Sequence, residues 1–502
     1  MEIELSGKNS IKILFIFLAV IYIYFAYNTT FLGEDEWIYM KIARDFDSLK
    51  WNIFDAQGLP ASYPPLISLI YAIPFLVSGV NLAIAKIIIA LFGVGIVCLI
   101  YLTSLKIDST SLKGFSIFGL ASISILLSIS SFTHYMQLAY VEIPIAFFSL
   151  LFLYAFLFKF NKLKDAVFLG VIMGISFYMK LSAIFLPIVL FIFAVLMFLL
   201  KKDKKTLKLS AIAIIVSVLV VSPWIVRNLI LYGYPFVEGL NLFFKLPPTY
   251  PEWVTEASQT LSVPVDMFST FSLISILFAV FSVVYCILAK DMKLSMPILM
   301  LVVFLLVYYL RFSIGSGISD PRYFSIIFPQ IALIGGYFLP KLYNDKKYFA
   351  ILLVAIIIFS FYVSLATAYQ TSSYQRYPDN YISALTELKK ISKPDDIVFT
   401  TYGGSLGYFA DRQNIWTIKE FPEVMTTTDS SYIYNTLRDY NISYILVWRG
   451  VVAQNYIVPE SNLIGAFTPT FINAVDGDKG RFETVYTNED NIVWRLNTSY
   501  VV

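Results

Sequence analysis

The chain has 502 residues, of which 58% are hydrophobic and only 14% are charged, and its mean hydropathy is +0.72. A soluble domain carries about 25% charged residues, so the composition excludes an ordinary soluble protein and indicates a polytopic α-helical membrane protein. The net charge of +3 is too small to favour nucleic acid as a partner. The two cysteines, Cys98 and Cys286, lie in apolar runs and imply no disulfide framework.

Apolar runs that approach the length of a membrane span recur over the first three quarters of the chain, since a span needs about 20 apolar residues. They lie at 13–31, 82–105, 114–132, 142–158, 181–200, 207–230, 269–289, 294–312, 322–340 and 348–368, with a shorter run at 166–180. The segment 66–79 is apolar but short, which fits an interfacial or re-entrant helix as well as a span.

The positions of the lysines decide how segment 66–79 is interpreted. Lysines cluster at Lys106/Lys113, Lys159/Lys162/Lys164, Lys201 to Lys208, Lys290/Lys293 and Lys341/Lys346/Lys347. The positive-inside rule places every cluster in the cytoplasm if 66–79 does not cross the membrane and 166–180 does. The sequence then predicts about eleven transmembrane helices in a multi-pass plasma-membrane protein, with the N-terminus cytoplasmic and the C-terminus extracytoplasmic. The high Ile, Lys and Tyr content favours a prokaryotic source.

The polar portions on the outer side define two predicted domains. Residues 32–81, 133–141 and 231–268 form outer loops of a transmembrane catalytic domain at 1–368. In residues 369–502, β-branched and aromatic runs such as SYILVW and NIVWRL alternate with segments of helical spacing such as SSYIYNTLRDYN. We therefore expect an extracytoplasmic α/β domain at 369–502.

Three acids, Glu34, Asp35 and Glu36, follow the first apolar run, and Tyr39 lies just after them. Carboxylates at the mouth of a membrane helix are costly to keep near lipid, so their clustering indicates acid–base chemistry on the outer face. The alternative is an acidic and aromatic flank of the membrane, which is common outside a span. We take Asp35 and Glu36 as candidate catalytic residues and Tyr39 as a candidate substrate contact.

The second outer loop adds one histidine and one acid. Glu142 opens the next apolar run, where it either favours the helix start or faces Asp35 across a shared cavity, so that two carboxylates divide the catalytic roles. His134 is the only histidine of the chain and either packs at the interface or contacts substrate. Because no Cys/His cluster has metal-ligand spacing, the sequence predicts no metal site.

Four further residues are candidate substrate contacts. Tyr63 precedes two prolines that fix a stiff entry to segment 66–79, which would place the tyrosine beside the acids. Arg227, in SPWIVRN, must snorkel to the interface or meet an anion, and a guanidinium binds two phosphate oxygens at once. Lys180 and Arg322 also fall on the outer side, which favours an external phosphate or other acidic partner.

These motifs, in this order and on this side of the membrane, resemble the GT-C glycosyltransferases, and above all the protein O-mannosyltransferase and lipid A aminoarabinose transferase superfamily. The shared features are the acidic first loop, the Pro-Pro turn, the acid of the second loop, PWxxRN before a long outer loop and a C-terminal outer domain with the stretch YFADR, residues 408–412. The resemblance covers roughly residues 13–368 and the YFADR stretch.

The resemblance implies an inverting transfer of a sugar from a polyprenyl-phosphate carrier, dolichyl or undecaprenyl, to a lipid, glycan or protein acceptor on the outer face. Asp35 matches the aspartate that activates or binds the acceptor, and Glu142 matches the second-loop acid. Arg227 and Lys180 match the cations that hold the lipid phosphate. No cofactor is expected besides the lipid-linked donor, and a metal is not required because the leaving group is a monophosphate.

The sequence also departs from the family pattern. Ile38 stands where aminoarabinose transferases carry an arginine, and Tyr63 stands where they carry a lysine, which argues against lipid A modification. The WWDxG motif of oligosaccharyltransferases is absent. Two other functions remain compatible with the residues. A transporter or flippase of lipid-linked sugars would use the same cavity without a general base, and a non-catalytic subunit would bind lipid or glycan through its C-terminal domain.

Overall fold

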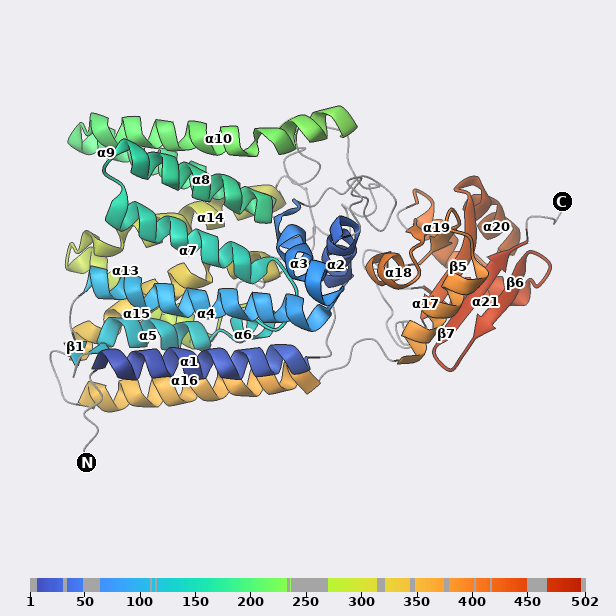
Figure 1. The fold of residues 1–502 in the computed structure, drawn as a ribbon, viewed down its shortest axis with the longest axis horizontal. Coiled ribbons are helices and arrows are strands. Elements are labelled where there is room, and N and C mark those ends of the chain that lie inside the picture. The colour runs from blue at the N-terminus through green and yellow to red at the C-terminus, as the bar shows by residue number, and fades with distance from the viewer. Residues whose placement is uncertain are drawn as a thin grey trace.

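A computed structural model describes residues 7–29, 34–47, 64–108, 111–112, 115–232, 235, 270–313, 321–343, 348–373, 379–400, 403–415, 418–448 and 467–497. The described chain forms a bundle of long helices with an α/β unit beyond one end of it (Figure 1). Two short helices, α2 (Glu34–Asp47) and α3 (Leu66–Ser78), lie at this same end of the bundle. They pack on each other and lie between the long helices and the α/β unit.

The long apolar runs of the sequence fold as the helices of the bundle. These are α1 (Gly7–Asn28), α4 (Leu82–Ile107), α5 (Ile117–Leu127), α6 (Ser130–Tyr135), α7 (Glu142–Lys159), α8 (Leu163–Met179), α9 (Phe185–Lys201), α10 (Lys204–Tyr232), α13 (Leu273–Leu288), α14 (Ser295–Ser313), α15 (Phe328–Tyr343) and α16 (Tyr348–Ser373). Within the described residues, 7 helices are long and apolar enough to cross a membrane, and α1, α3, α5 and α13 are shorter apolar helices. The chain is therefore a polytopic α-helical membrane protein.

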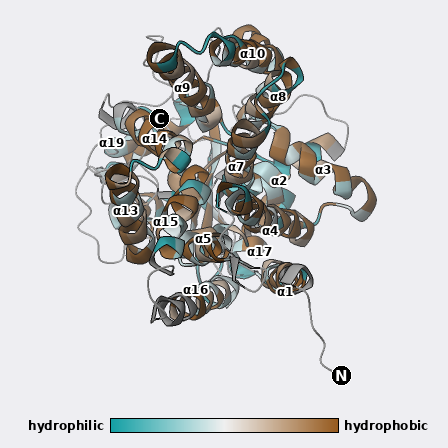
Figure 2. Ribbon diagram, turned by 90° about the vertical axis from the view of Figure 1, so that its left-hand side faces the viewer, coloured by the Kyte–Doolittle hydropathy of each residue, from teal (hydrophilic) through white to brown (hydrophobic). Residues whose placement is uncertain are grey.

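The surface of the bundle matches a lipid environment. Peripheral helices such as α1, α9, α10 and α13 are coloured as hydrophobic along much of their length (Figure 2). Large apolar side chains on them, including Ile16, Leu200 and Leu288, are exposed. Lipid tails cover such residues at no cost, whereas water would not.

The described lysines of the predicted clusters lie at one end of the bundle. Lys341 binds Asp108 just after α4, with 2.8 Å between Nζ and Oδ2. Lys106 lies over the ring of Tyr154, 5.0 Å from its centroid, near the end of α7. These contacts join three helix ends that are far apart in sequence, on the side opposite to α2 and α3 (Figure 1).

The structure corrects three elements of the sequence analysis. The run 114–132 is divided into α5 and α6, because Ile129 is extended and the Ser128 hydroxyl donates to the carbonyl of Ile125 at 2.7 Å. The run 322–340 begins with a 3-10 helix, η3 (Pro321–Ile327), and becomes an α-helix only at Phe328. The segment 32–81, predicted as the first outer loop, contains α2, whose amphipathic pattern is too short and too polar to stand out in the sequence.

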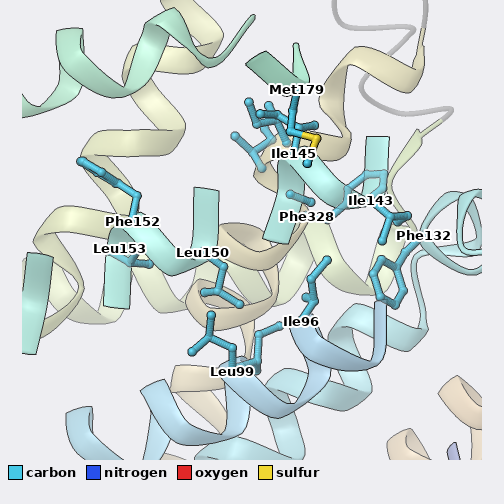
Figure 3. Close-up of a cluster of buried hydrophobic side chains, with 14 of the residues drawn as sticks. Ile96, Leu99, Phe132, Ile143, Ile145, Leu150, Phe152, Leu153, Met179 and Phe328 are labelled. Atoms are coloured by element: carbon cyan, nitrogen blue, oxygen red, sulfur yellow. The ribbon is translucent and has the colours of Figure 1, made fainter. Parts of the chain in front are cut away.

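The core of the bundle is an apolar contact between α4, α7 and their neighbours. Ile96 of α4 and Leu150 and Leu153 of α7 are buried there, and Phe328 closes the cluster from α15 (Figure 3). Close packing of this kind leaves little room for the helices to shift. The candidate site, described below, lies at the ends of α7, α8 and η3. The apolar packing in the interior of the bundle therefore fixes these ends.

Glycines allow a close helix contact in the bundle, between α15 and α5. A Cβ added at Gly336 would lie 2.5 Å from the backbone nitrogen and 2.6 Å from the Cα of Ser122. A Cβ at the adjacent Gly335 would instead meet the Cγ2 of Ile125 at 3.3 Å. The first contact involves backbone, which cannot move aside, and the second involves the end of a side chain, which can.

We therefore expect Gly336→Ala to lower the melting temperature of the detergent-solubilised protein strongly, with a cost of about 1–3 kcal/mol or more. Gly335→Ala is the matched control on the same helix and is expected to cost clearly less. Thermal unfolding followed by tryptophan fluorescence measures both. Equal melting temperatures for the two variants would show that α5 and α15 can move apart freely.

The C-terminal unit is built on a five-stranded mixed sheet with the order β4-β3-β5-β7-β6. Its strands are β3 (Ile397–Phe399), β4 (Gln413–Asn414), β5 (Ile442–Trp448), β6 (Phe482–Thr487) and β7 (Asn491–Leu496). Strand β3 is parallel to β4 and β5, whereas β7 is antiparallel to β5 and β6. Helices α17 (Asp379–Ile391), α18 (Gly403–Phe409), α19 (Phe421–Thr426), α20 (Ser430–Asp439) and α21 (Pro469–Gly477) accompany the sheet.

Alternate residues of each strand enter opposite faces of this sheet. Ile445 and Val447 pack in a cluster with residues of α19, α20 and α21. Tyr444 and Leu446 pack in a second cluster with residues of α17 and α18. The period of two is what a strand covered on both faces requires. The unit is thus a three-layer sandwich, and its α17–α18 face is the one turned toward α2 (Figure 1).

Candidate active site

Helix α2 carries Asp35 in its first turn, where a carboxylate interacts favourably with the helix dipole. The carboxylate of Asp35 accepts a hydrogen bond from Nη1 of Arg322. Arg322 lies in η3, which is distant from α2 in the sequence. The side chains of Asp35 and Arg322 are 20% and 23% exposed, so the pair is accessible and not sealed in the core. This contact brings together two residues that the sequence separates by 287 positions.

Glu142 lies beside this pair and is almost fully buried, with a side chain that is 2% exposed. It begins α7, and its Oε1 accepts a hydrogen bond from Nζ of Lys180 at 2.6 Å. The Nε of Arg322 lies 4.0 Å from the same oxygen. Arg322 therefore stands between the carboxylates of Asp35 and Glu142, and Lys180 covers Glu142 from the end of α8. Two acids and two cations share one site, which is neutral as a whole.

Aromatic rings surround the two cations. The ring of Tyr323 lies 4.6 Å from the Nζ of Lys180 and 5.7 Å from the guanidinium carbon of Arg322. The ring of Tyr140 lies 5.8 Å from the same guanidinium carbon. Cations over ring faces keep part of their stabilisation when water is removed. In such a site another anion can replace a carboxylate as the partner of a cation, because the aromatic rings stay in contact with the cation during the exchange.

Tyr39 is buried on the same helix as Asp35. Burial, and then the nearby charges of Asp35 and Glu142, raise the pKa of the Tyr39 hydroxyl well above its ordinary value. Burial and the charges of Glu36 and Asp35 do the same for the pKa of Tyr140. Both phenols therefore remain protonated at any working pH and can act only as neutral hydrogen-bond donors or acceptors.

Glu36 lies behind this site and has a backbone partner. It is fully buried, and its Oε1 accepts a hydrogen bond from the amide of Ala139 at 2.5 Å. Lys86 of α4 is also buried in this region and donates to the carbonyl of Thr29 at 2.8 Å. Glu36 thereby ties α2 to the segment that leads into α7 and to Glu142.

The other candidate residues occupy different places. His134 bonds the hydroxyl of Thr371 in α16 through Nδ1 at 3.0 Å, so it joins α6 to α16. Arg227 of α10 donates to Asn228 at 2.9 Å and lies over the ring of Trp224, 4.4 Å from its centroid. The structure thus brings Asp35, Glu142, Lys180, Arg322 and Tyr39 together, and places Arg227 and His134 in other contacts. Tyr63 lies outside the described residues.

Sequence reasoning missed Lys86 and the partner of Arg322. Lys86 was detectable, because a lysine inside the apolar run 82–105 is a charged residue in a membrane helix and such residues are usually functional or paired. The pairing of Arg322 with Asp35 had no local signal. Among the residues that the structure describes, no group of three or more His, Cys, Asp or Glu side chains could hold a metal ion.

Comparisons with known proteins bear on the fold. A family model described as Domain of unknown function (DUF8201) matches residues 141–261, about a quarter of the chain, which include Glu142 and Lys180. No curated protein matches the sequence.

Solved structures match over nearly the whole chain. ArnT from Cupriavidus metallidurans bound to undecaprenyl phosphate is 12% identical with a TM-score of 0.64, over 98% of this chain and 98% of that chain. The oligosaccharyltransferase AglB from Archaeoglobus fulgidus, in complex with an inhibitory peptide and a dolichol-phosphate, is 13% identical with a TM-score of 0.65, over 98% and 75% of the two chains. The arabinofuranosyltransferase AftD from Mycobacteria is 12% identical with a TM-score of 0.57, over 97% and 40%.

The chain has the GT-C fold. The resemblance inferred from the sequence motifs is confirmed at this level, because the similar structures are polytopic membrane glycosyltransferases. The match to ArnT includes almost all of both chains, so it extends over the C-terminal unit as well as the bundle. The acids and cations described above lie where the bundle of this GT-C fold meets that unit.

A double-mutant cycle tests the buried pair of this GT-C site. Lys180→Met leaves Glu142 with only the more distant Arg322 as a cation, at 4.0 Å, and a buried charge that loses its nearest partner costs about 2 kcal/mol or more. Removing the charge as well, in Lys180→Met with Glu142→Gln, should recover part of the loss, giving a coupling of about 1–3 kcal/mol. Unfolding in detergent, followed by circular dichroism, gives the free energies.

The exposed pair Lys390 and Glu387 is the matched control for this cycle, since its side chains are 63% and 38% exposed. An exposed pair couples weakly. If the two cycles gave the same coupling, Glu142 would be solvated and not buried against Lys180.

His134 predicts a pH dependence of stability. Burial lowers the pKa of its imidazole from 6.5 to about 4. The unfolded chain then takes up a proton at higher pH than the folded chain. The stabilisation is fully present above pH 6.5 and is lost as the pH falls toward 4, to an extent of roughly 1–3 kcal/mol. We expect His134→Gln to flatten this part of the melting-temperature profile, and an unchanged slope in the variant would assign the pH dependence to other groups.

Proposed function

We propose that the protein is an inverting glycosyltransferase that moves a sugar from a polyprenyl-phosphate carrier to an acceptor on the outer face of the membrane. The observation that carries the proposal is the shared position of Arg322 between Asp35 and Glu142, with Lys180 on Glu142. This arrangement supplies one accessible carboxylate and two cations within a single site. The site lies at one end of the bundle and the lysine clusters lie at the other. Because the positive-inside rule places the lysine clusters in the cytoplasm, it assigns the end with the site to the outside.

The donor class follows from the cations. A lipid phosphate is an anion at the membrane surface, and a guanidinium with a neighbouring ammonium group is well suited to hold its oxygens. Undecaprenyl phosphate is bound in the ArnT structure and dolichol-phosphate in the AglB structure. We assign Lys180 and Arg322 to the donor phosphate, and Arg227 to the approach of the donor along α10.

The residues of this site can account for each proton and bond of the transfer step. The acceptor hydroxyl gives its proton to Asp35 while its oxygen attacks C1 of the sugar from the face opposite to the phosphate. The bond between C1 and the phosphate oxygen breaks, and the electron pair leaves with the lipid phosphate. Lys180 and Arg322 compensate the charge that grows on this oxygen. The step as written requires no metal.

The resting pair of Asp35 and Arg322 gives this step an order. While the guanidinium is bonded to Asp35, it occupies a carboxylate oxygen that the acceptor hydroxyl would need. A donor phosphate that draws Arg322 toward itself releases Asp35 for the acceptor. Glu142, held by Lys180, keeps both cations within reach, and Glu36 positions the segment before α7 through the amide of Ala139.

Sugar transfer in proteoliposomes tests the proposal. Polyprenyl-phosphate hexoses and pentoses with a radiolabelled sugar are offered beside nucleotide sugars. We expect label to leave only the lipid-linked donor, and Asp35→Asn to lower the rate by about 10²–10⁴-fold, as loss of a general base does. Arg322→Met should in addition raise the KM for the lipid donor.

Asp203→Asn is the matched control, because Asp203 is a partly exposed carboxylate just before α10, outside the proposed site, and asparagine caps a helix equally well. It should transfer sugar at the wild-type rate. A transporter would move the lipid-linked sugar across the bilayer without breaking it, and Asp35→Asn would then resemble other cavity variants. A binding protein would retain the donor intact in both variants. Either result contradicts the proposed transferase.

A further inference from the structure

The YFADR stretch of the C-terminal unit (residues 408–412) has no part in the chemistry proposed above, yet it contacts the helix that carries Asp35. Tyr408 and Phe409 end α18, and α18 packs on α2. In Figure 1, α18 is the element of the α/β unit that lies nearest to α2. The contact therefore connects the sheet of the C-terminal unit to the site through a pair of short helices.

Trp37 forms the apolar part of this contact. It lies two residues after Asp35 and is 3% exposed. Its ring lies 4.7 Å from the ring of Tyr408 and 4.6 Å from that of Phe409, centroid to centroid. Trp37 belongs to the apolar cluster that α17 and α18 form on the sheet. A residue of the membrane portion thus completes one of the two cores of the C-terminal unit.

Arg44 forms the polar part of the contact, near the other end of α2. Its Nη1 donates to the carbonyl oxygen of Tyr408 at 2.8 Å, and its Nη2 to Oδ1 of Asp411 at 2.9 Å. Nine residues of helix separate Asp35 from Arg44, or about 13 Å along the axis. Trp37 and Arg44 therefore hold both the first and the last turns of α2 against the same short stretch.

The stretch itself is held rigidly. Asp411 adopts a left-handed backbone conformation with φ of 56°, which directs the chain sharply after α18. Arg412 is buried and binds the carbonyl oxygens of Lys389 and Ser392, at 2.9 and 2.6 Å, at the end of α17. A guanidinium that satisfies several carbonyls in this way fixes the loop to the layer behind it. The YFADR residues that contact α2 are consequently fixed to the core of the C-terminal unit.

We propose that the YFADR stretch is a positioning element for α2, and that Arg44 and Asp411 orient the helix so that Asp35 faces Arg322. This inference rests on the proposed function only for its catalytic consequence. Met40 and Ala43 of α2 pack in the core of the bundle, while Arg44 reaches the YFADR stretch, so the orientation of the helix depends on both the bundle and the C-terminal unit. A general base that is displaced by even 1 Å loses most of its effect.

The test uses the full-length protein in nanodiscs, with Arg44→Met and Asp411→Asn. Asparagine accepts the left-handed conformation of residue 411, so the second variant removes the charge and keeps the backbone. We expect amide hydrogen exchange in α2 to become at least about tenfold faster in both variants, while exchange in α15 is unchanged. We also expect kcat to fall at least about tenfold, with the KM for the lipid donor within about threefold of wild type.

Glu483→Gln is the control, because it breaks an exposed pair with Arg495 on the β6–β7 edge of the same unit. It should leave α2 exchange and kcat as in the wild type. Wild-type exchange in α2 of Arg44→Met, or an unchanged kcat, overturns the positioning role. The exchange measurement needs no turnover, so it separates this inference from the proposed function. If the wild type transferred no sugar, but amide exchange in α2 were still faster in the two variants, only the proposed function would be contradicted.

Discussion

The guanidinium of Arg322, shared between Asp35 and Glu142, is the interaction on which the rest of the site depends. Charges at the end of an apolar bundle are stable only in compensated groups, because each uncompensated charge costs several kcal/mol when water is withdrawn. Two acids with two cations satisfy this requirement. The same balance leaves the group ready for an anion, since a phosphate can replace a carboxylate as the partner of the guanidinium.

The bundle fixes the partners of this group with unequal rigidity. Glu142 and Lys180 follow from the ends of α7 and α8, which a packed apolar core holds in place. Arg322 lies in a short 3-10 helix just before α15. Asp35 is carried by α2, a short helix that packs on α3 and on the C-terminal unit. The residue proposed to accept the proton is thus carried by a helix whose position also depends on contacts outside the bundle.

The C-terminal unit is therefore more than an addition to the helix bundle. Its sheet is covered on one face by its own helices α19 to α21, and on the other by α17, α18 and a tryptophan from α2. Because α2 and the C-terminal unit contribute side chains to the same core, a change in the packing of one affects the other. Through this shared core the C-terminal unit is in direct contact with the helix that carries the carboxylate of the site.

The sequence by itself determined the elements whose signals are local. Runs of apolar residues predicted almost every helix of the bundle, because lipid selects side chains one helix at a time. Lysine positions separated the two ends, and the acids, Lys180 and Arg322 stood out as charges in an apolar context. Tertiary structure alone decided which charges pair. The bond from Arg322 to Asp35 depends on how helices distant in sequence pack, and helix α2 is stabilised by neighbours and not by its own pattern. The burial of Glu36 on the amide of Ala139 has the same origin, since a carboxylate in a predicted loop gives no sign of the backbone group it will meet.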